Sequence, residues 1–264
     1  MIEFADLHKS FGPKRVLEGF TLEVRDGETM VVIGGSGSGK SVAIKHVVGL
    51  LEPDAGHVAV DAQIVHVLDR AALTALRARI GFVFQFAALF DSLTVFENVA
   101  FGLRRRRDLA ESEVDDRVAQ ALALVNLSGN EEHMPAELSG GMRKRVGLAR
   151  AIAIRPTYML YDEPTTGLDP VTAAVIDELM VRTREALGVT SIVITHDMRS
   201  AYRVGDRIAM LYRGRIRQVG TADEIRASED PVVRGFVEGR PDERIFDAGR
   251  GGPEAELAVR GPAS

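Results

Sequence analysis

The first 30 residues of the chain alternate between hydrophobic and polar side chains. The segments IEFADL and TLEV show the two-residue period of half-buried strands, and Gly12-Pro13 and Asp26-Gly27 are typical turn pairs. This pattern predicts an antiparallel sheet near the start of the chain.

Residues 31–50, VVIGGSGSGKSVAIKHVVGL, change character twice. The β-branched run at residues 31–33 predicts a buried strand, and the apolar residues that recur from Val42 to Leu51 predict a helix packed against it. Glycines and serines join the two elements. A strand, a glycine-rich loop and a helix in this order indicate a site for phosphate.

The rest of the chain alternates between predicted helices and strands. Residues from about 92 to 157 are mainly helical in pattern, as in RVAQALALVNL and GGMRKRVGLARAIAI. They are followed by the strand TYMLYDEP, the helix VTAAVIDELMVRTREALG and the strand TSIVITHD. Strands separated by helices predict a parallel sheet. We therefore expect one α/β domain over residues 1–238, with an N-terminal antiparallel β subdomain and a helical subdomain inserted at about 92–157.

Composition narrows the class of protein. The chain has 264 residues, of which 45% are hydrophobic, so it can bury the core of one large domain. Its formal net charge of −5 argues against a general nucleic-acid binder, and the absence of cysteine excludes disulfides and thiolate metal sites. The sequence shows neither a secretory signal pattern nor an apolar run of roughly 18 residues. We expect a cytoplasmic protein that reaches a membrane only through a partner.

The pattern Gly34-x-x-x-x-Gly39-Lys40-Ser41 has a specific chemistry. Glycines let backbone N–H groups turn towards the β- and γ-phosphates, and the following helix adds partial positive charge. Lys40 would neutralise phosphate oxygens, and the Ser41 hydroxyl would ligate Mg²⁺. The predicted nucleotide contacts of this segment are Gly34, Gly35, Ser36, Gly37, Ser38, Gly39, Lys40, Ser41 and Val42.

Two acidic residues end the later strand YMLYDEP. In a phosphate-loop enzyme, Asp162 at the strand end is placed to hold Mg²⁺ through water, and Glu163 to polarise the attacking water. A carboxylate pair after a strand is common on a protein surface. Its place in a later strand of an α/β pattern favours the catalytic interpretation.

A second phosphate-binding pattern, LSGGM, begins another amphipathic helix. It would offer the hydroxyl of Ser139 and the backbone N–H groups of Gly140 and Gly141. One chain needs only one such site for one triphosphate. The second site therefore predicts contact with a nucleotide held by another copy of the chain.

Together these motifs make the chain resemble the ATP-binding cassette family, the ATPases of ABC transporters, from residue 1 to about 238. The resemblance depends on GGSGSGKS, Gln85 in FVFQF, LSGGM, YMLYDEP, the GLD of residues 167–169 and His196 in VITHD, in this order. It implies a phosphate-loop NTPase fold with a RecA-like parallel sheet. It also implies hydrolysis of ATP with Mg²⁺. It further implies a head-to-tail homodimer in which each ATP lies between the phosphate loop of one subunit and the LSGGM loop of the other.

The resemblance further implies roles for single residues. Gln85 would sense Mg²⁺ and the membrane partner, Asp169 would cross the dimer interface, and His196 would contact the γ-phosphate. Phe11 stands where the family places an aromatic ring against adenine. Taken singly, these residues also fit ordinary roles: a surface amide, a structural histidine, or an aromatic side chain of the core.

A narrower resemblance concerns the subgroup that serves Mce-type phospholipid transporters, the maintenance-of-lipid-asymmetry system. It depends on Met142, where most members have Gln, on Ser41-Val42, and on FAALFDSLTVFENVAF. It implies integral membrane permease subunits, an Mce-domain lipid-binding protein and a small regulatory subunit as partners, at the cytoplasmic face of the inner membrane. Since Ser139 and its glycines stay intact, we expect activity to be retained.

Three other functions fit parts of the pattern. The same ATPase would also serve an importer of polar solutes. A soluble cassette protein acting on DNA or ribosomes would need a long heptad insertion or two cassettes, and the sequence shows neither. A small-molecule kinase is contradicted by LSGGM.

Residues 239–264 have the Gly-, Pro- and charge-rich composition of a tail. Such a tail is either solvated and disordered or an anchor for the neighbouring subunit. The apolar pair Ile245-Phe246 and the C-terminal extension of the resembling subgroup favour a dimer clasp.

Overall fold

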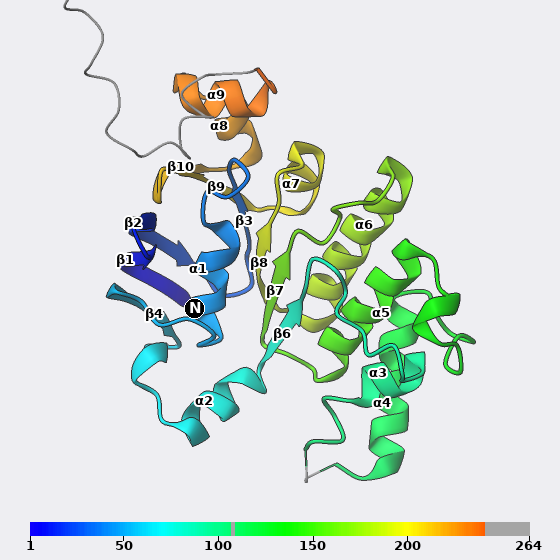
Figure 1. Ribbon diagram of the computed structural model, residues 1–264. Helices are drawn as coiled ribbons and strands as arrows, with labels where there is room; N and C mark the ends of the chain where they lie inside the picture. Colours follow the sequence, from blue (N-terminus) through cyan, green and yellow to red (C-terminus); the bar gives the residue numbers. More distant parts are fainter. Residues whose placement is uncertain (107–108, 241–264) are drawn as a thin grey trace, which may run out of the picture.

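The computed structural model describes residues 1–106 and 109–240 of the chain. Figure 1 shows two sheets, with helix α1 between them and a layer of helices on the far side of the larger sheet. The predicted dimer clasp at Ile245-Phe246 lies outside the described residues.

The smaller sheet is antiparallel, with the strand order β2-β1-β4-β5. Its strands are β1 (Ile2–Phe11), β2 (Lys14–Val24), β4 (Ala55–Val60) and β5 (Gln63–Ile64). Two of them precede the glycine-rich loop, as predicted. The other two follow helix α1, so this sheet is built from segments on both sides of the loop.

The larger sheet has the strand order β10-β9-β3-β8-β7-β6. It contains β3 (Thr29–Ile33), β6 (Ile80–Val83), β7 (Tyr158–Asp162), β8 (Thr190–Ile194), β9 (Arg207–Tyr212) and β10 (Arg215–Gly220). The first five are parallel, and β10 is an antiparallel edge strand. The predicted parallel sheet is therefore confirmed.

The helices divide between the two sides of this sheet. Helices α1 (Lys40–Val47) and α2 (Arg70–Arg77) lie on the side of the smaller sheet. The others are α3 (Val95–Ala100), α4 (Glu111–Leu124), α5 (Gly140–Ala153), α6 (Pro170–Leu187), α7 (Met198–Val204), α8 (Ala222–Arg226) and α9 (Pro231–Val237), and 3₁₀ turns lie at Val65–Val67 and Pro135–Glu137. Helices α3, α4 and α5 fall in the segment predicted to be helical.

One helix boundary was predicted wrongly. The apolar repeat continues to Leu51, but α1 ends at Val47. Gly49 then takes φ +60, a left-handed conformation that suits glycine and turns the chain away. The apolar residue Val48 still packs in the core after the helix has ended. A prediction from the hydrophobic period alone therefore makes the helix too long.

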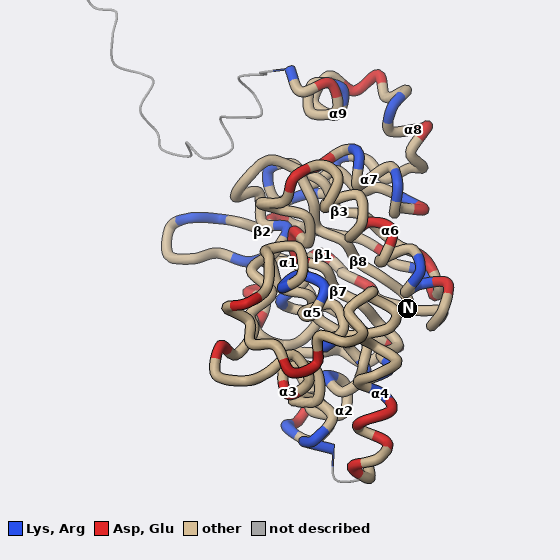
Figure 2. Tube along the Cα trace, turned by 90° about the vertical axis from the view of Figure 1, so that its right-hand side faces the viewer, with Lys and Arg blue, Asp and Glu red and all other residues tan. Residues whose placement is uncertain are grey.

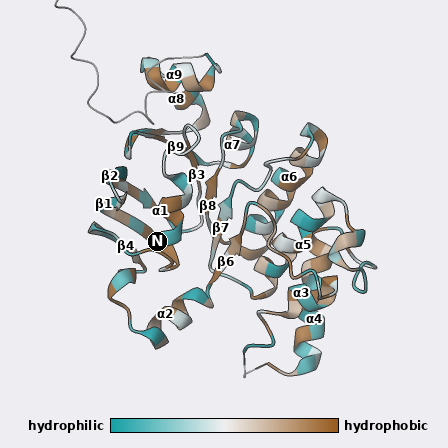
Figure 3. Ribbon diagram, in the orientation of Figure 1, coloured by the Kyte–Doolittle hydropathy of each residue, from teal (hydrophilic) through white to brown (hydrophobic). Residues whose placement is uncertain are grey.

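The larger sheet separates two hydrophobic clusters, and its strands contribute to both. In β3, Met30 and Val32 pack with α1 and the smaller sheet, whereas Val31 and Ile33 pack with the helices on the other face. This alternation follows from the two-residue period of a strand covered on both sides. Figure 3 shows the resulting hydrophobic central strands beside helices with one polar face.

Charge is mixed over the described surface. Figure 2 shows basic and acidic residues interspersed along the trace, with acidic residues gathered on α4. In residues 1–106 and 109–240, no helix is both long and apolar enough to cross a membrane.

Candidate functional site

The glycine-rich loop joins the end of β3 to the start of α1, and two of its glycines are required by close contacts. A side chain at Gly34 would place Cβ 2.5 Å from the carbonyl oxygen of Leu211. At Gly39, where φ is +106, Cβ would lie 2.9 Å from Val16 Cγ1. At these two positions the loop therefore passes too close to its neighbours for any larger residue.

A cavity of about 730 Å³ opens over this loop. Most of the predicted site residues line it: the whole segment from Gly34 to Val42, with Phe11, Gln85, Glu163 and His196. Ser38 Oγ is buried there without a hydrogen-bond partner in the described chain. An unpaired buried hydroxyl in a glycine-rich cradle fits a polar ligand such as phosphate.

Lys40 brings a buried positive charge to the cavity. Its side chain is 5% exposed, and Nζ donates hydrogen bonds to the carbonyl oxygens of Gly34, at 2.8 Å, and Gly35, at 3.0 Å. Glu163 Oε1 lies 4.0 Å from the same nitrogen. Burial lowers the pKa of Lys40, and the charges of Glu163 and Asp162 oppose that shift.

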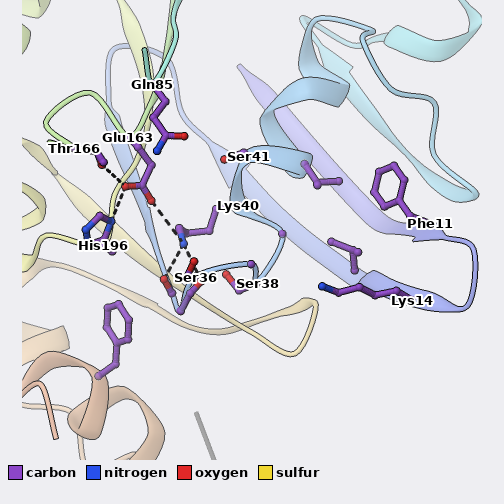
Figure 4. Close-up of a pocket in the computed structure, with 17 residues that line it drawn as sticks. Phe11, Lys14, Ser36, Ser38, Lys40, Ser41, Gln85, Glu163, Thr166 and His196 are labelled. Atoms are coloured by element: carbon purple, nitrogen blue, oxygen red, sulfur yellow. Dashed lines mark hydrogen bonds and ion pairs between the residues drawn. The ribbon is translucent and has the colours of Figure 1, made fainter. Parts of the chain in front are cut away.

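Glu163 is held from two sides. Oε2 accepts a hydrogen bond from Thr166 Oγ1 at 2.7 Å and lies 2.5 Å from His196 Nδ1 (Figure 4). The residue has φ +52, in the left-handed region, directly after the last residue of β7. Such a conformation is strained for a residue with a side chain and persists only where the surroundings hold it. The carboxylate is thus fixed beside the loop.

Ser41, Asp162 and Gln85 offer oxygen atoms of the kind that Mg²⁺ prefers. Ser41 Oγ donates to Asp162 Oδ1 at 2.5 Å, and the amide of Gln85 points towards Ser41 in Figure 4. The described residues contain no group of three or more His, Cys, Asp or Glu that would hold a metal by themselves. A hydroxyl, a carboxylate and an amide fit Mg²⁺ when substrate phosphates complete the ligand set.

At the end of the cavity away from His196, the lining side chains are apolar and basic (Figure 4). Phe11 lies there, 48% exposed, with Lys14 nearby (Figure 4). Val16 also lines the cavity, as does Phe236 from α9. An exposed ring at the rim of a polar cavity offers a stacking face rather than a core contact.

The remaining predicted residues lie outside this cavity. Ser139 caps the N-terminus of α5 by accepting a hydrogen bond from the N–H of Met142 at 3.2 Å, and both Ser139 and Gly140 are exposed. Asp169 caps the N-terminus of α6 by accepting hydrogen bonds from the N–H groups of Val171 and Thr172 and from the Thr172 hydroxyl. A Cβ on Gly141 would lie 2.5 Å from Thr172 Cγ2. The two helix starts therefore form a second surface, separate from the cavity.

Sequence reasoning missed several residues of the site. Thr166 lies between the motifs YMLYDEP and GLD, three residues after Glu163. Lys144 Nζ donates to the carbonyl of Gln85 at 2.6 Å and lies 3.5 Å from that of Glu163; burial lowers its pKa. No sequence pattern marks Phe236 as a residue of the site, because its helix lies far along the chain from the motifs.

Comparison with known proteins places the chain in a family. A family model described as ABC transporter matches residues 17–166. The chain is 41% identical over 239 residues to "Probable ribonucleotide transport ATP-binding protein mkl" of Mycobacterium tuberculosis, covering 90% of this chain and 67% of that protein. It is also 41% identical over 262 residues to "Protein TRIGALACTOSYLDIACYLGLYCEROL 3, chloroplastic" of Arabidopsis thaliana, covering 92% of this chain and 74% of that protein.

Solved structures agree with this placement. A dimeric ATP-binding cassette in a post-hydrolysis state, bound to ADP and Pi, matches with TM-score 0.77 and 33% identity over 84% of this chain and 99% of that one. The cbiO1 protein of Clostridium perfringens, part of the ABC transporter complex cbiONQ, matches with TM-score 0.79 and 29% identity over 89% and 93%. The chain thus belongs to the ABC transporter family, as one of its ATP-hydrolysing subunits with a phosphate-loop α/β fold.

Proposed function

We propose that this chain is the ATP-hydrolysing subunit of a bacterial ABC transporter that moves phospholipid, or a related hydrophobic substrate, between membranes. The observation that carries the catalytic part is the carboxylate of Glu163, held by Thr166 and His196 at 4.0 Å from Lys40. The lipid part is supported by the motif resemblance and by 41% identity to a relative named after a galactolipid.

In this proposal the residues of the cavity have different roles in ATP hydrolysis. The loop of residues 34–41 and Lys40 bind the phosphates, and Glu163 polarises the attacking water. Because an ionised carboxylate only accepts hydrogen bonds, Nδ1 of His196 carries the proton in its contact with Glu163. Its Nε2 donates to a γ-phosphate oxygen only when that nitrogen also carries a proton, so this contact requires the imidazolium form of the ring.

Mg²⁺ would be held by Ser41, Asp162 and Gln85, and when bound it supplies positive charge to the phosphate oxygens. Adenine would stack on Phe11, at the other end of the cavity from His196 (Figure 4). With these two assignments, the nucleotide would extend along the cavity from the proposed Mg²⁺ residues to Phe11.

A homodimer completes the site in this account. Ser139, Gly140 and Gly141 lie with Asp169 on the second surface and do not line the cavity of their own chain. These helix starts offer N–H groups to a phosphate held by another copy. The related cassette bound to ADP and Pi is described as dimeric, which supports this arrangement.

The permease would dock beside Gln85. Phe86 is 84% exposed and Phe90 is 43% exposed, which is unusual for aromatic residues so close together. Asn98 is buried and holds the loop of Phe90 in shape, since its amide accepts from the N–H of Phe90 and donates to the carbonyls of Phe90, Leu93 and Thr94. A preformed apolar loop is suited to grip a helix of a membrane partner.

The further partners proposed are an Mce-domain lipid-binding protein and a small cytoplasmic regulatory subunit, with the ATPase peripheral on the cytoplasmic face of the inner membrane. A tail at residues 239–264 that clasps the second subunit belongs to the same proposal.

A polar-solute importer is the second candidate. The chain is 40% identical over 242 residues to "Methionine import ATP-binding protein MetN" of Xylella fastidiosa, close to its identity with the lipid-named relative. Purification of the assembled transporter from its own cell membrane distinguishes the two. An Mce-domain protein with bound phospholipid supports the first candidate, and a soluble solute-binding protein supports the second.

Replacement of Glu163 by Gln should preserve ATP binding and nearly abolish turnover. The amide keeps the shape but lacks the charge that polarises water, and each 1.4 kcal/mol of barrier is about tenfold in rate. Steady-state phosphate release measures the effect, with Glu185→Gln, an exposed glutamate of α6, as control. Hydrolysis by Glu163→Gln within a few-fold of wild type would remove Glu163 from this role.

Replacement of Phe11 by Ala should weaken ATP binding by about 1–3 kcal/mol, the range for a base stacked on an aromatic ring. Phe11→Tyr keeps the ring and should bind as wild type does. Calorimetric titration with ATP compares the three proteins. Equal affinity of the folded Phe11→Ala variant would show that the ring does not contact adenine.

Replacement of Phe90 by Asp should spare basal ATPase activity and prevent assembly with the permease, because an unpaired charge in an interface is costly. Phe90→Leu, which stays apolar, is the matched control. Pull-down after co-expression with the permease of the same gene cluster measures assembly. Normal assembly and transport with Phe90→Asp would contradict this docking site.

A further inference from the structure

Helices α6 and α7 share a buried polar contact that the proposed chemistry does not use. Ser200 Oγ on α7 donates a hydrogen bond to Asp177 Oδ2 on α6 at 3.0 Å. Asp177 is 4% exposed and Ser200 is 2% exposed. The other carboxylate oxygen, Asp177 Oδ1, has no partner within the described chain.

A buried carboxylate with one unpaired oxygen is costly to a fold. Burial raises the pKa of Asp177 to about 6; the Ser200 hydrogen bond and the charge of Arg203 oppose the shift, and the charge of Asp197 adds to it. An apolar residue would fill this position without that cost. The carboxylate therefore needs an explanation other than packing.

Both helices lead directly to residues of the proposed site. Helix α7 begins after Asp197, which caps it by accepting a hydrogen bond from the N–H of Arg199 at 2.8 Å. The residue before Asp197 is His196, whose ring contacts Glu163 at 2.5 Å. Helix α6 begins after Asp169, on the second surface. Asp177 and Ser200 thus connect the helix that follows His196 to the helix that follows Asp169.

The side chain of His196 has few contacts of its own. It is 59% exposed. The backbone on either side of it is held by three hydrogen bonds: from the N–H of Thr195 to the carbonyl of Val32 at 3.3 Å, from the N–H of Glu163 to the carbonyl of Ile194 at 3.0 Å, and from the N–H of Asp197 to Thr195 Oγ1 at 3.0 Å. The end of β8 and the start of α7 therefore fix the backbone from which this ring extends.

We propose that Asp177 and Ser200 are positioning residues that fix α7 against α6 and so hold the ring of His196 against Glu163. The inference rests on the roles proposed above for His196 and Glu163. A further contact, from Arg203 Nη1 to the carbonyl of Ala174 at 3.3 Å, joins the same two helices nearer their exposed side. Loss of the buried link would let α7 pivot on that contact and move His196.

Four variants separate positioning from simple stability. Asp177→Ala and Ser200→Ala each remove the link. Asp177→Asn keeps an oxygen that accepts from Ser200 and should rescue function. Thr183→Val is the matched control, because Thr183 is a fully buried hydroxyl of α6 that donates to Leu179 of its own helix at 2.7 Å and not to α7.

The first readout is kinetic. A displacement of about 1 Å at a reacting centre can lower a rate by up to a hundredfold. We expect Asp177→Ala and Ser200→Ala to lower kcat about tenfold with KM for ATP within about twofold of wild type. Asp177→Asn and Thr183→Val should keep kcat within about threefold, although Thr183→Val loses a buried hydrogen bond and lowers the unfolding midpoint.

The second readout is the histidine ring spectrum of nucleotide-free protein. The chain has six histidines, so the ring signals of His196 can be assigned by their loss in His196→Gln. Asp177→Ala and Ser200→Ala should shift or broaden the His196 signals, and Asp177→Asn and Thr183→Val should leave them in place. This readout does not depend on hydrolysis.

The inference would be overturned if both Ala variants kept the wild-type kcat and left the His196 signals in place. It would also be overturned if Thr183→Val lowered kcat as much as the Ala variants do. If Asp177→Ala does not fold, Ser200→Ala alone decides. If instead the roles proposed for Glu163 and His196 are wrong, the Glu163→Gln variant will hydrolyse ATP normally, so that failure is seen in a separate experiment.

Discussion

The buried ammonium of Lys40 is the charge around which the site is arranged. A charged group out of water is costly unless it is paired and hydrogen-bonded. Here two backbone carbonyls, those of Gly34 and Gly35, and the more distant carboxylate of Glu163 provide that pairing. Phosphate oxygens carry more negative charge than carbonyl dipoles, so a bound nucleotide suits this nitrogen better than the loop does.

The parallel sheet explains why residues far apart in the chain meet at Lys40. The glycine-rich loop follows β3, Gln85 follows β6, Glu163 follows β7 and His196 follows β8. These four strands are neighbours, in the order β3-β8-β7-β6, and their carboxyl ends lie at one edge. Ligands of open α/β sheets bind at this edge. Two hydrophobic clusters cover the faces of the sheet and so keep the edge rigid.

Much of this arrangement could be predicted from the sequence, because local patterns carry it. The β-branched run before Gly34, the acids after β7 and the histidine after β8 each mark a strand end, and parallel strands bring such ends together. What was missed depends on contacts between distant segments. The pairing of β4 with β1 places a strand from beyond α1 in the first sheet. Lys144 reaches Gln85 and Glu163 only because α5 packs beside β6, and nothing in the local sequence of either segment marks that contact.

The binding of MgATP to a Lys40→Met variant tests the central claim most directly. Methionine keeps the length of the side chain and removes the charge, and a hydrogen bond to a charged group contributes about 1.5–3 kcal/mol. Calorimetric titration should show an affinity about 10- to 100-fold weaker than that of wild type, while the unfolding midpoint shows a folded variant. Equal affinity for MgATP in a folded Lys40→Met protein would contradict the account, since the cavity would then bind nucleotide without the charge that organises it.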